Sequence, residues 1–588
     1  MVVDAPWQNV FAQRELRTTL ESILPDYLHH CRWYIGNGRA VQSTHIAEIV
    51  PVPYKDTEAQ VVWLEVEYIQ GEPQTYVLLL TYAEGESAQY LLTDQPRAVV
   101  AKLQIKGQDE TRILYDAIAD KDFLSSLLNA IAHNHSYRGK LGELIASVTD
   151  IFPHLTATAT QLEPTLLRST HRNTSIIYGD HLILKLFRKI EGGNNPDLEV
   201  RRFLSDKKQI QHFTRIAGVL EYRRPNTDTM TVGILQEYIL DARNTWDYTL
   251  DSLRDYFEHI MVQHSSLTEV PVPSGSLLEL QSSFDSVETF EDLEMGKYRD
   301  GDSSVAFSIG SRAYPASSEV SHSFDPSTQL LASQVIGSYL ANAKLLGQCT
   351  AELHLALASD PENPDFAPEP FSSFYQRSIY QYARNLSGQT LLLLKQRLKL
   401  LPAKSQELAR ALLNRQDQLM SQFQLVLNQK ITAMRTRTHG DYHLGQVLYT
   451  GKDFVIIDFE GEPSRNLSER RMKRSPLRDV AEMLQSFGYA ANVALRNEIE
   501  SGIIRPEMLP VMEQWAQFWE RWVSAAFLHA YLKAADHANF LPKSQQELQV
   551  LLDSYLLEKM LYSLSCELNS RPDWVEIPLR RILLEIGN

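Results

Sequence analysis

The motifs HGDYHLGQ at residues 439–446 and VIIDFE at 455–460 carry more information about the fold than any other part of this sequence. Gln446 follows Asp441 at an offset of five residues, and Asp458 comes directly after an apolar run that predicts a strand. Phosphoryl transfer needs a carboxylate beside an acceptor hydroxyl, and an amide oxygen and a second carboxylate on a cation. The pattern therefore predicts that Asp441 is a catalytic base and that Gln446 and Asp458 bind Mg²⁺.

The three residues of HGD are unspecific by themselves. The alternative interpretation is a β-hairpin in which both aspartates only cap turns. An amide at the expected offset, and a second aspartate within twenty residues of the first, favour the catalytic interpretation. Asn is more usual than Gln at the metal-binding position of such motifs, so Gln446 is a variant of the expected ligand.

The composition is typical of a globular protein, with 44% hydrophobic and 22% charged residues in a chain of 588. No apolar run approaches the ~18–20 residues of a membrane-spanning helix, and the first residues lack the pattern of a signal peptide. We therefore expect a cytoplasmic protein with no membrane partner. The formal charge of −16 argues against nucleic acid as a partner. A bound nucleotide would need local basic side chains and a cation.

The cysteines Cys31, Cys349 and Cys566 lie far apart in the sequence. They form no CxxC pair, and an odd number does not fit a disulfide framework. We expect free thiols in a reducing compartment. No group of His and Cys residues has the sequence spacing of a zinc site, so the sequence predicts none.

The first 240 residues are predicted to contain most of the strands. Residues 1–105 begin with a helical stretch and continue with alternating strand patterns, whereas 106–165 are predicted to be mainly helical. A β-hairpin is expected at 175–187, because a Gly-Asp turn separates two apolar runs. Residues 106–240 are interpreted as the nucleotide-binding lobe that follows a β-rich cap.

Residues 241–588 are predicted to form a helical lobe. Long amphipathic patterns fill most of it, and a short strand pair near 445–459 interrupts them. Residues 269–327 are rich in Ser, Asp, Glu and Gly, and we interpret them as an insertion. The predicted fold class is α+β, with a cap and a small sheet lobe beside a large helical lobe, as in a bilobal kinase.

A lysine and a glutamate are candidates for the nucleotide side. Lys185 lies in a predicted strand, and Glu199 lies near the start of the helix that follows. In kinase-like sites a strand lysine meets the α- and β-phosphates and is held by a helix glutamate. The alternative is an exposed strand lysine and a first-turn glutamate favoured by the helix dipole. The order of Lys185, Asp441 and Asp458 along the chain favours the first interpretation.

Two short segments complete the predicted ATP site. Asn173, Thr174 and Ser175 precede or begin the hairpin and could cover the phosphates with hydroxyls and backbone N–H groups. The segment lacks the glycines of a Gly-rich loop, so this signal is weak. Gln236 and Tyr238 lie where a hinge would hold the adenine by backbone hydrogen bonds.

Several further segments share a family resemblance. They are RWY (32–34), NTS (173–175), KLFR (185–188), NPDLE (195–199), WDYTL (246–250), LGQCTAELH (346–354), FEGEP (459–463), EK (558–559) and NSRPDW (569–574). Together with HGDYHLGQ they resemble the bacterial maltokinases over nearly the whole chain, apart from the proposed insertion. FEGEP is the most specific segment, because related aminosugar kinases share the HGD frame but vary there.

The resemblance implies a eukaryotic-protein-kinase-like fold shared with aminoglycoside phosphotransferases, preceded by the family's N-terminal cap. It implies ATP- and Mg²⁺-dependent phosphorylation of maltose at its anomeric hydroxyl, giving maltose 1-phosphate and ADP. Such enzymes feed α-glucan (glycogen) synthesis and are linked to trehalose metabolism. A functional association with trehalose synthase is therefore expected.

The sequence departs from the family pattern at five positions. Arg172 replaces a small polar residue near the phosphates. Gln485 and Gly488 stand where Arg and Asp are common, and Ser563 and Cys566 stand where Glu and Tyr are usual near the sugar pocket. The departures concern the identity of the sugar more than the nucleotide chemistry.

The candidate sugar-binding residues combine planar polar groups with aromatic faces: His439, Arg465, Lys559, Tyr562, Arg571 and Trp574. Lys559 and Tyr562 are three residues apart and share a helix face. The alternative is that the aromatic rings are core residues, that Lys559 extends along the surface and that Arg465 belongs to an ion-pair network. His439 could equally brace the catalytic loop.

Three functions remain open on the sequence. The first is a maltokinase, and the second is a kinase of the same fold that acts on another sugar such as glucosamine. The third is a non-catalytic regulator that binds sugar or nucleotide. The intact set of Lys185, Glu199, Asp441, Gln446 and Asp458 argues against the third, because a regulator has no need of both aspartates.

Overall fold

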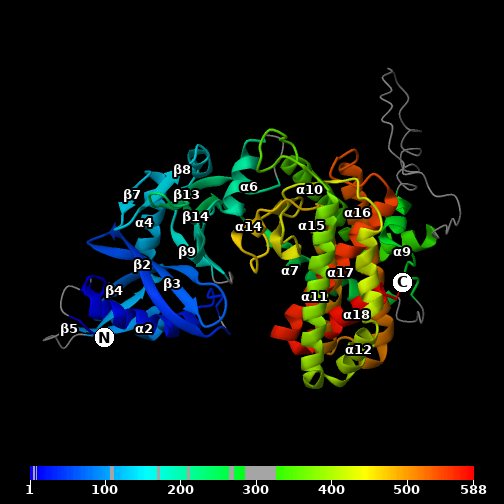
Figure 1. Ribbon diagram of the computed structural model, residues 1–588, viewed down its shortest axis with the longest axis horizontal. Helices are drawn as coiled ribbons and strands as arrows, with labels where there is room; N and C mark the ends of the chain where they lie inside the picture. The colour runs from blue at the N-terminus through cyan, green and yellow to red at the C-terminus, as the bar shows by residue number, and fades with distance from the viewer. Residues whose placement is uncertain are drawn as a thin grey trace, which may run out of the picture. The chain divides into compact units, whose positions relative to one another are not determined.

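The computed structural model describes residues 1–3, 7, 9–36, 38–105, 111–159, 161–167, 172–207, 212–263, 270–284 and 326–587. Most of the expected insertion therefore lies outside the described residues. The chain forms two compact units. Unit 1 comprises Met1–Asp206 and Thr214–Asp241, and unit 2 comprises Lys207–Phe213 and Ala242–Asn588. Each unit is shown in Figure 1 and is described by itself.

The first sheet of unit 1 has the strand order β1-β5-β6-β4-β3-β2, with β12 added beside β4. The strands are β1 (Val2–Val3), β2 (Val41–Tyr54), β3 (Thr57–Tyr68), β4 (Gln74–Ala83), β5 (Val99–Ile105), β6 (Thr111–Asp116) and β12 (Lys189–Ile190). Strand β3 is buried on both faces. Val62 and Leu64 pack with Leu24 of helix α2 (Arg14–His30), and Trp63 points into a second core.

The second sheet of unit 1 has the strand order β7-β8-β13-β14-β11-β10-β9. The strands are β7 (Ser136–Arg138), β8 (Glu143–Val148), β9 (Pro164–Leu167), β10 (Asn173–Tyr178), β11 (Leu182–Phe187), β13 (Ile216–Arg223) and β14 (Met230–Glu237). The predicted hairpin is present as β10 and β11, and Gly179 at φ 56° makes the left-handed turn between them.

The two sheets of unit 1 share one hydrophobic core. Trp63 of the first sheet stacks on Tyr222 of the second, with ring centroids 4.4 Å apart. Arg188, directly after β11, is 2% exposed, and its guanidinium Nη2 lies 2.9 Å from the Asp116 carboxylate at the end of β6. Its guanidinium also lies over the ring of Trp33. The N-terminal sheet is thus joined to the second sheet by both apolar and charged contacts.

The expectation of a mainly helical segment at 106–165 is wrong in part. Helix α4 (Lys121–Ala132) is present, but β6, β7 and β8 also lie in this stretch. Strand β6 pairs with β4 and β5, so the first sheet continues beyond residue 105. The strands were missed because their polar residues hide the alternation, and long-range pairing decides their conformation.

Unit 2 is mainly helical, as predicted. Its long helices are α7 (Thr245–Gln263), α9 (Pro326–Ile336), α10 (Tyr339–Leu357), α11 (Ser373–Arg397), α12 (Ala403–Asn414), α13 (Gln416–Gln424), α15 (Leu477–Glu500), α16 (Leu509–Ala534), α17 (Gln545–Ser570) and α18 (Glu576–Glu585). Figure 1 shows α11, α15 and α17 packed along one another. The predicted strand pair is present as β18 (Val447–Tyr449) and β19 (Phe454–Ile456).

Helix α16 forms the centre of the unit 2 core. Trp515, Trp519 and Trp522 are each at most 1% exposed on it. Helix α10 packs closely against it because Gly347 has no side chain; a Cβ there would overlap the carbonyl oxygen of Phe527. The α+β class predicted from the sequence is confirmed. Among the described helices, none combines the length and apolar character that crossing a membrane requires.

Candidate functional site

The HGD segment in unit 2 is held by one buried carboxylate. Asp479 lies in the first turn of α15 and is fully buried. Its two oxygens accept the backbone N–H of His439 (2.7 Å) and of Gly440 (3.0 Å), while the Nε2 of His354 lies 3.1 Å away. The loop conformation is therefore fixed immediately before Asp441, which is half-buried.

His439 braces the loop, which is one of the two roles that the sequence leaves open. Its side chain is 1% exposed, and its ring contacts those of Tyr442 and Phe459. Nε2 lies 2.9 Å from the carbonyl oxygen of Ile457, and Nδ1 accepts the backbone N–H of Asp441 at 3.3 Å. Both ring nitrogens thus contact the loop backbone, and binding of a sugar by His439 stays a prediction.

Backbone conformation positions the second aspartate. Asp458 has φ 68°, in the left-handed region that non-glycine residues seldom occupy. Such residues concentrate at functional sites, where the surrounding structure holds them. Gly440 and Gly461 also have positive φ, and a Cβ on Gly440 would lie 3.3 Å from the Cα of Gly461. Glycine is required at 440 so that the two loops can approach each other.

The predicted Mg²⁺ ligands lie at one end of the β18–β19 pair. The backbone N–H of Ile457 donates to the carbonyl oxygen of Gln446 at 3.0 Å, so Gln446 lies opposite the residue before Asp458. The carboxylate of Glu460, which the sequence did not single out, comes within 4.8 Å of that of Asp458. Carboxylate and amide oxygens are ligands that Mg²⁺ accepts, so the donor set fits this ion.

Lys559 was predicted to bind sugar, but it is 5% exposed and pairs with a carboxylate. Its Nζ lies 2.7 Å from Oε1 of Glu482 on α15. The other oxygen of Glu482 accepts the backbone N–H of Tyr442 at 3.1 Å. Lys559 thus holds a carboxylate that supports the backbone directly after Asp441, and its contact with a sugar stays a prediction.

Arg465 belongs to a buried charge network. Its Nε donates to Glu462 at 2.7 Å, and its guanidinium lies over the Tyr382 ring. Glu462 and Glu558 both pair with Arg478. Burial alone would raise the pKa of Glu462, but the charges of Arg465, Lys559 and Arg478 lower it to about 2. The ion-pair alternative for Arg465 is therefore the one observed.

Tyr562, a predicted sugar residue, is half-buried beside this network, and its pKa is raised mainly by burial.

Arg571 and Trp574 form a separate group near the end of α17. Arg571 pairs with Glu567 at 2.6 Å, and its guanidinium lies 5.2 Å from the Trp574 ring. Arg496 also lies over that ring, at 4.3 Å. Trp574 is thus engaged with two guanidinium groups.

One departure from the family pattern has a structural reason. A Cβ on Gly488 of α15 would overlap the guanidinium of Arg581, which pairs with Glu520 at 2.7 Å. Glycine at this position makes room for the α18 arginine. Gln485, one turn earlier, is 7% exposed and its amide is buried.

The nucleotide side in unit 1 centres on Lys185 of β11. Its side chain is largely buried, and its Nζ lies 3.1 Å from Oδ2 of Asp197. Asp197, in the first turn of helix α6 (Pro196–Ser205), also accepts from Arg201 at 2.7 Å and is fully buried. Burial alone would raise its pKa, but Arg201 and Lys185 lower it. Asp197, two residues before the predicted Glu199, is therefore a partner that the sequence analysis missed.

The segment expected to cover the phosphates is part of a strand. Asn173, Thr174 and Ser175 begin β10, and Thr174 and Ser175 are less than 8% exposed. The hydroxyl of Thr174 accepts from Arg188 at 2.8 Å, and its contact with a nucleotide stays a prediction. Ser175 pairs with Lys185 across the sheet, so the two side chains share a face.

The predicted hinge is only partly available to an adenine. The backbone N–H of Tyr238 donates to the carbonyl oxygen of His181 at 2.8 Å, and that of Glu237 donates to Arg215. The backbone N–H of Tyr238 is thus already engaged within unit 1, and the hinge role of this segment stays a prediction. Gln236 lies in β14 and is 9% exposed.

Comparison with known proteins finds relatives of parts of this chain. The family model described as the maltokinase N-terminal cap domain matches residues 27–120. Glucosamine kinase of Mycolicibacterium smegmatis (strain ATCC 700084 / mc(2)155) is 46% identical over 59 residues, which is 10% of this chain and 14% of that protein. The chain is similar to sugar kinases of the maltokinase and glucosamine kinase type.

Solved structures extend this similarity over nearly the whole chain. Glucosamine kinase in complex with glucosamine, ADP and inorganic phosphate has a TM-score of 0.55 and 13% sequence identity, with 99% of each chain covered. Crystal form B of glucosamine kinase also has a TM-score of 0.55, with 14% identity, 94% of this chain and 96% of that chain covered. This likeness shows the fold, and the expected resemblance to the maltokinases is matched by the family model over residues 27–120.

The two buried aspartates were the main residues that sequence reasoning missed. Asp197 and Asp479 each lie in the first turn of a helix, where an acidic residue is ordinarily explained by the helix dipole. The signal available was their position: Asp197 lies within NPDLE, and Asp479 follows a Ser-Pro pair by three residues. Their burial and partners become visible only in the folded protein.

Proposed function

We propose that this protein transfers the γ-phosphoryl group of ATP to the anomeric hydroxyl of maltose, giving maltose 1-phosphate and ADP. The observation that carries the proposal is the buried Asp479, whose two oxygens hold the backbone on which Asp441 is presented. Phosphoryl transfer has a loose transition state, so positioning contributes more than base strength. A loop fixed by internal hydrogen bonds suits that requirement.

Asp441 acts as the base in this proposal. It accepts the proton of the sugar hydroxyl as that oxygen attacks the γ-phosphorus and the bond to the β-phosphate oxygen breaks. The proton is held at the Asp441 carboxylate, and the leaving group is ADP. An anomeric hydroxyl is more acidic than other sugar hydroxyls, so the carboxylate needs little adjustment of its pKa.

Asp458 and Gln446 are the proposed Mg²⁺ ligands, with Glu460 as a further carboxylate close to Asp458. When bound, Mg²⁺ supplies positive charge that offsets the charge of the phosphate oxygens. Lys185 is proposed to hold phosphate oxygens of ATP. Its ammonium is oriented by Asp197, and the nearby Ser175 shares its face of the sheet.

The choice of maltose rests on the cap-domain match and on the FEGEP segment at 459–463. The link to trehalose metabolism and to trehalose synthase rests on the same resemblance. The network around Glu462 and Arg465 lies within FEGEP and directly after it. The charge of Lys559 acts on Glu462, and the charge of Glu462 raises the pKa of the neutral Tyr562. We therefore propose that this network shapes the sugar side of the site.

A coupled assay of ADP release, run beside a reducing-sugar assay, tests the proposal. The full chain with ATP and Mg²⁺ should release ADP fastest with maltose and lose one reducing end for each ADP formed. Asp458→Ala is the control: it should abolish ADP release while the protein stays folded. If ADP is released while the number of reducing ends stays constant, the phosphate is added to another hydroxyl. If turnover is faster with glucosamine than with maltose, glucosamine is the acceptor.

A further inference from the structure

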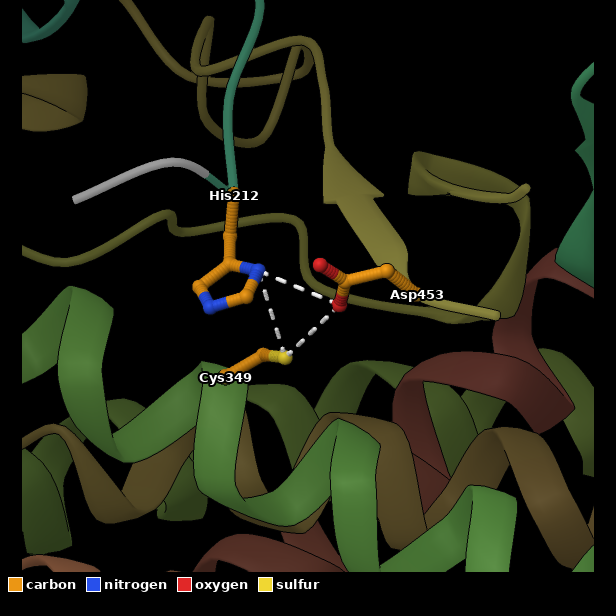
Figure 2. A group of neighbouring side chains, drawn as sticks. All are labelled: His212, Cys349 and Asp453. Atoms are coloured by element: carbon orange, nitrogen blue, oxygen red, sulfur yellow. Dashed lines mark hydrogen bonds and ion pairs between the residues drawn. The ribbon is translucent and has the colours of Figure 1, made fainter. Parts of the chain in front are cut away.

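Three side chains from separate segments of unit 2 converge at one point. His212 lies in the segment Lys207–Phe213, Cys349 lies in α10, and Asp453 directly precedes β19 (Figure 2). The Nδ1 of His212 lies 3.5 Å from the Cys349 Sγ and 3.3 Å from Oδ1 of Asp453. The Sγ and the same Oδ1 are 3.8 Å apart. One nitrogen, one sulfur and one oxygen thus form a small triangle.

The size of this triangle fits a tetrahedral metal ion. Zinc binds sulfur at about 2.3 Å and nitrogen or oxygen at about 2.0–2.2 Å. At tetrahedral angles these bonds place the ligand atoms about 3.4–3.6 Å from one another. The three observed separations, 3.3, 3.5 and 3.8 Å, lie close to those values. Three protein ligands with one position left for water is a common arrangement for zinc.

A second carboxylate orients the imidazole for this role. Oε2 of Glu352, one turn along α10 from Cys349, lies 2.9 Å from the Nε2 of His212. The other oxygen of Glu352 accepts from Gln348 at 2.8 Å. Metal-binding histidines almost always donate their second ring N–H to a carboxylate or carbonyl, which leaves the first nitrogen with its lone pair toward the metal. The contact with Glu352 has that form.

We propose that His212, Cys349 and Asp453 bind a divalent zinc-like cation, with Glu352 as the carboxylate that orients His212. The Cys349 side chain is 1% exposed, whereas Asp453 is 40% exposed and offers a path from solvent. Because the thiol must lose its proton to bind, metal binding releases that proton. This site is distinct from the proposed Mg²⁺ ligands, which are all oxygen atoms.

The proposed site would fasten His212 to the β18–β19 hairpin and to α10 of unit 2. The carbonyl oxygen of His212 accepts the backbone N–H of Ile456 at 2.7 Å, and Phe213 bridges to the same strand. Ile456 is two residues before Asp458. The bound cation would hold the chain at His212 and Phe213, α10 and the β18–β19 hairpin together at this point. The role assigned is therefore structural.

A metal-free arrangement of the same atoms is the competing explanation. A protonated His212 could donate to Glu352 and to Asp453 or the carbonyl oxygen of Phe454, which lies 3.3 Å from Nδ1. In that case Cys349 is a buried thiol that only packs beside the pair. The two explanations differ in one observable, a bond between the metal and the thiolate sulfur.

Cobalt absorption tests this difference directly. The full chain is treated with a chelator, dialysed and titrated with Co²⁺ alone, and the near-ultraviolet band of a cobalt–thiolate bond is followed. We expect the band to saturate at about one equivalent. Cys349→Ser should abolish it, and Glu352→Gln should weaken Co²⁺ binding about 10–100-fold. Cys566→Ser, which removes an exposed thiol, is the matched control and should keep the band.

The expected band should also persist in Asp458→Ala, which separates this site from the proposed Mg²⁺ site. The proposal is overturned if the unmodified protein shows no cobalt–thiolate band, or if the band remains in Cys349→Ser. If Cys349→Ser does not fold, as judged by circular dichroism, His212→Ala and Asp453→Asn decide the question, because both side chains are partly exposed. An unchanged band in both variants leaves only the hydrogen-bonded cluster.

Discussion

Unit 1 and unit 2 each contain a fully buried aspartate that holds a predicted functional group, but they neutralise its charge differently. Asp197 in unit 1 is paired with two cations, Lys185 and Arg201. Asp479 in unit 2 accepts two backbone N–H groups and contacts His354. The first arrangement holds a side chain in place, whereas the second holds a stretch of backbone.

Both aspartates show that burial does not by itself decide the charge of a carboxyl group. Burial alone would raise each pKa. For Asp197 the charges of Arg201 and Lys185 outweigh it, and for Asp479 the contact with His354 and the N–H of Gly440 contribute to lowering it. Asp553 on α17 is a useful contrast, because burial and the nearby Glu585 raise its pKa to about 7, offset only in part by Gln549.

The largest expected effect is the loss of the catalytic charge that the Asp479 arrangement presents. Asp441→Asn keeps the side-chain shape and the backbone N–H that donates to His439. We expect kcat to fall by ~10²–10⁴, the usual effect of losing a general base, with little change in ATP binding. Steady-state kinetics with maltose as acceptor measure it. A kcat within threefold of the unmodified protein would contradict the assignment of Asp441.

Removing the unit 1 carboxylate should mainly affect stability and nucleotide use. Asp197→Ala leaves Lys185 and Arg201 buried without this partner, and breaking a buried pair in this way costs about 3–5 kcal/mol. We expect a lower urea midpoint and a raised KM for ATP. Arg202→Ala, which removes a half-exposed cation from the same helix, is the control. Unchanged stability and KM in Asp197→Ala would show that the lysine is held by other groups.

Removing the unit 2 carboxylate, Asp479, should change kcat, in contrast to the change in KM expected for Asp197→Ala. Asp479→Ala leaves two buried backbone N–H groups unsatisfied, at a cost of about 1–3 kcal/mol each. Because those groups precede Asp441, we expect kcat to fall while the KM for ATP stays nearly constant. Asp479→Asn keeps one carbonyl acceptor and should recover part of the stability. A rise in the KM for ATP alone would mean that the two aspartates do not have the separate roles compared here.

Asp553 should give the smallest effect, and one that depends on pH. Its folded-state pKa, about 7, lies above the unfolded value of about 4. Its contribution to stability is therefore complete below pH 4 and is lost as the pH rises through 7. Asp553→Asn should therefore raise the free energy of unfolding at pH 8 but not at pH 4, as measured by urea unfolding at both pH values. The exposed Asp573→Asn should show no such pH-dependent difference.

Local patterns were sufficient for much of the fold. The β10–β11 hairpin follows from two apolar runs around a Gly-Asp turn, and α6 begins where Asn195 caps a helix with Pro196 in its first turn. These elements depend on residues close in sequence, so their patterns are visible there. Strand β8 is not visible as a local pattern because it pairs with β13, far along the chain, and β7 joins the sheet only through β8.

The sequence by itself determined which residues could perform phosphoryl transfer: Asp441, Gln446, Asp458 and Lys185 are chemical types at recognisable spacings. Only the tertiary structure decided which buried carboxylates support them, because Asp197 and Asp479 act through partners on other elements. It also placed Lys559 and Arg465 beside the carboxylates of Glu482 and Glu462. The physical reason is that a buried charge must be compensated by whatever donors folding brings within about 3 Å, and sequence spacing does not record that distance.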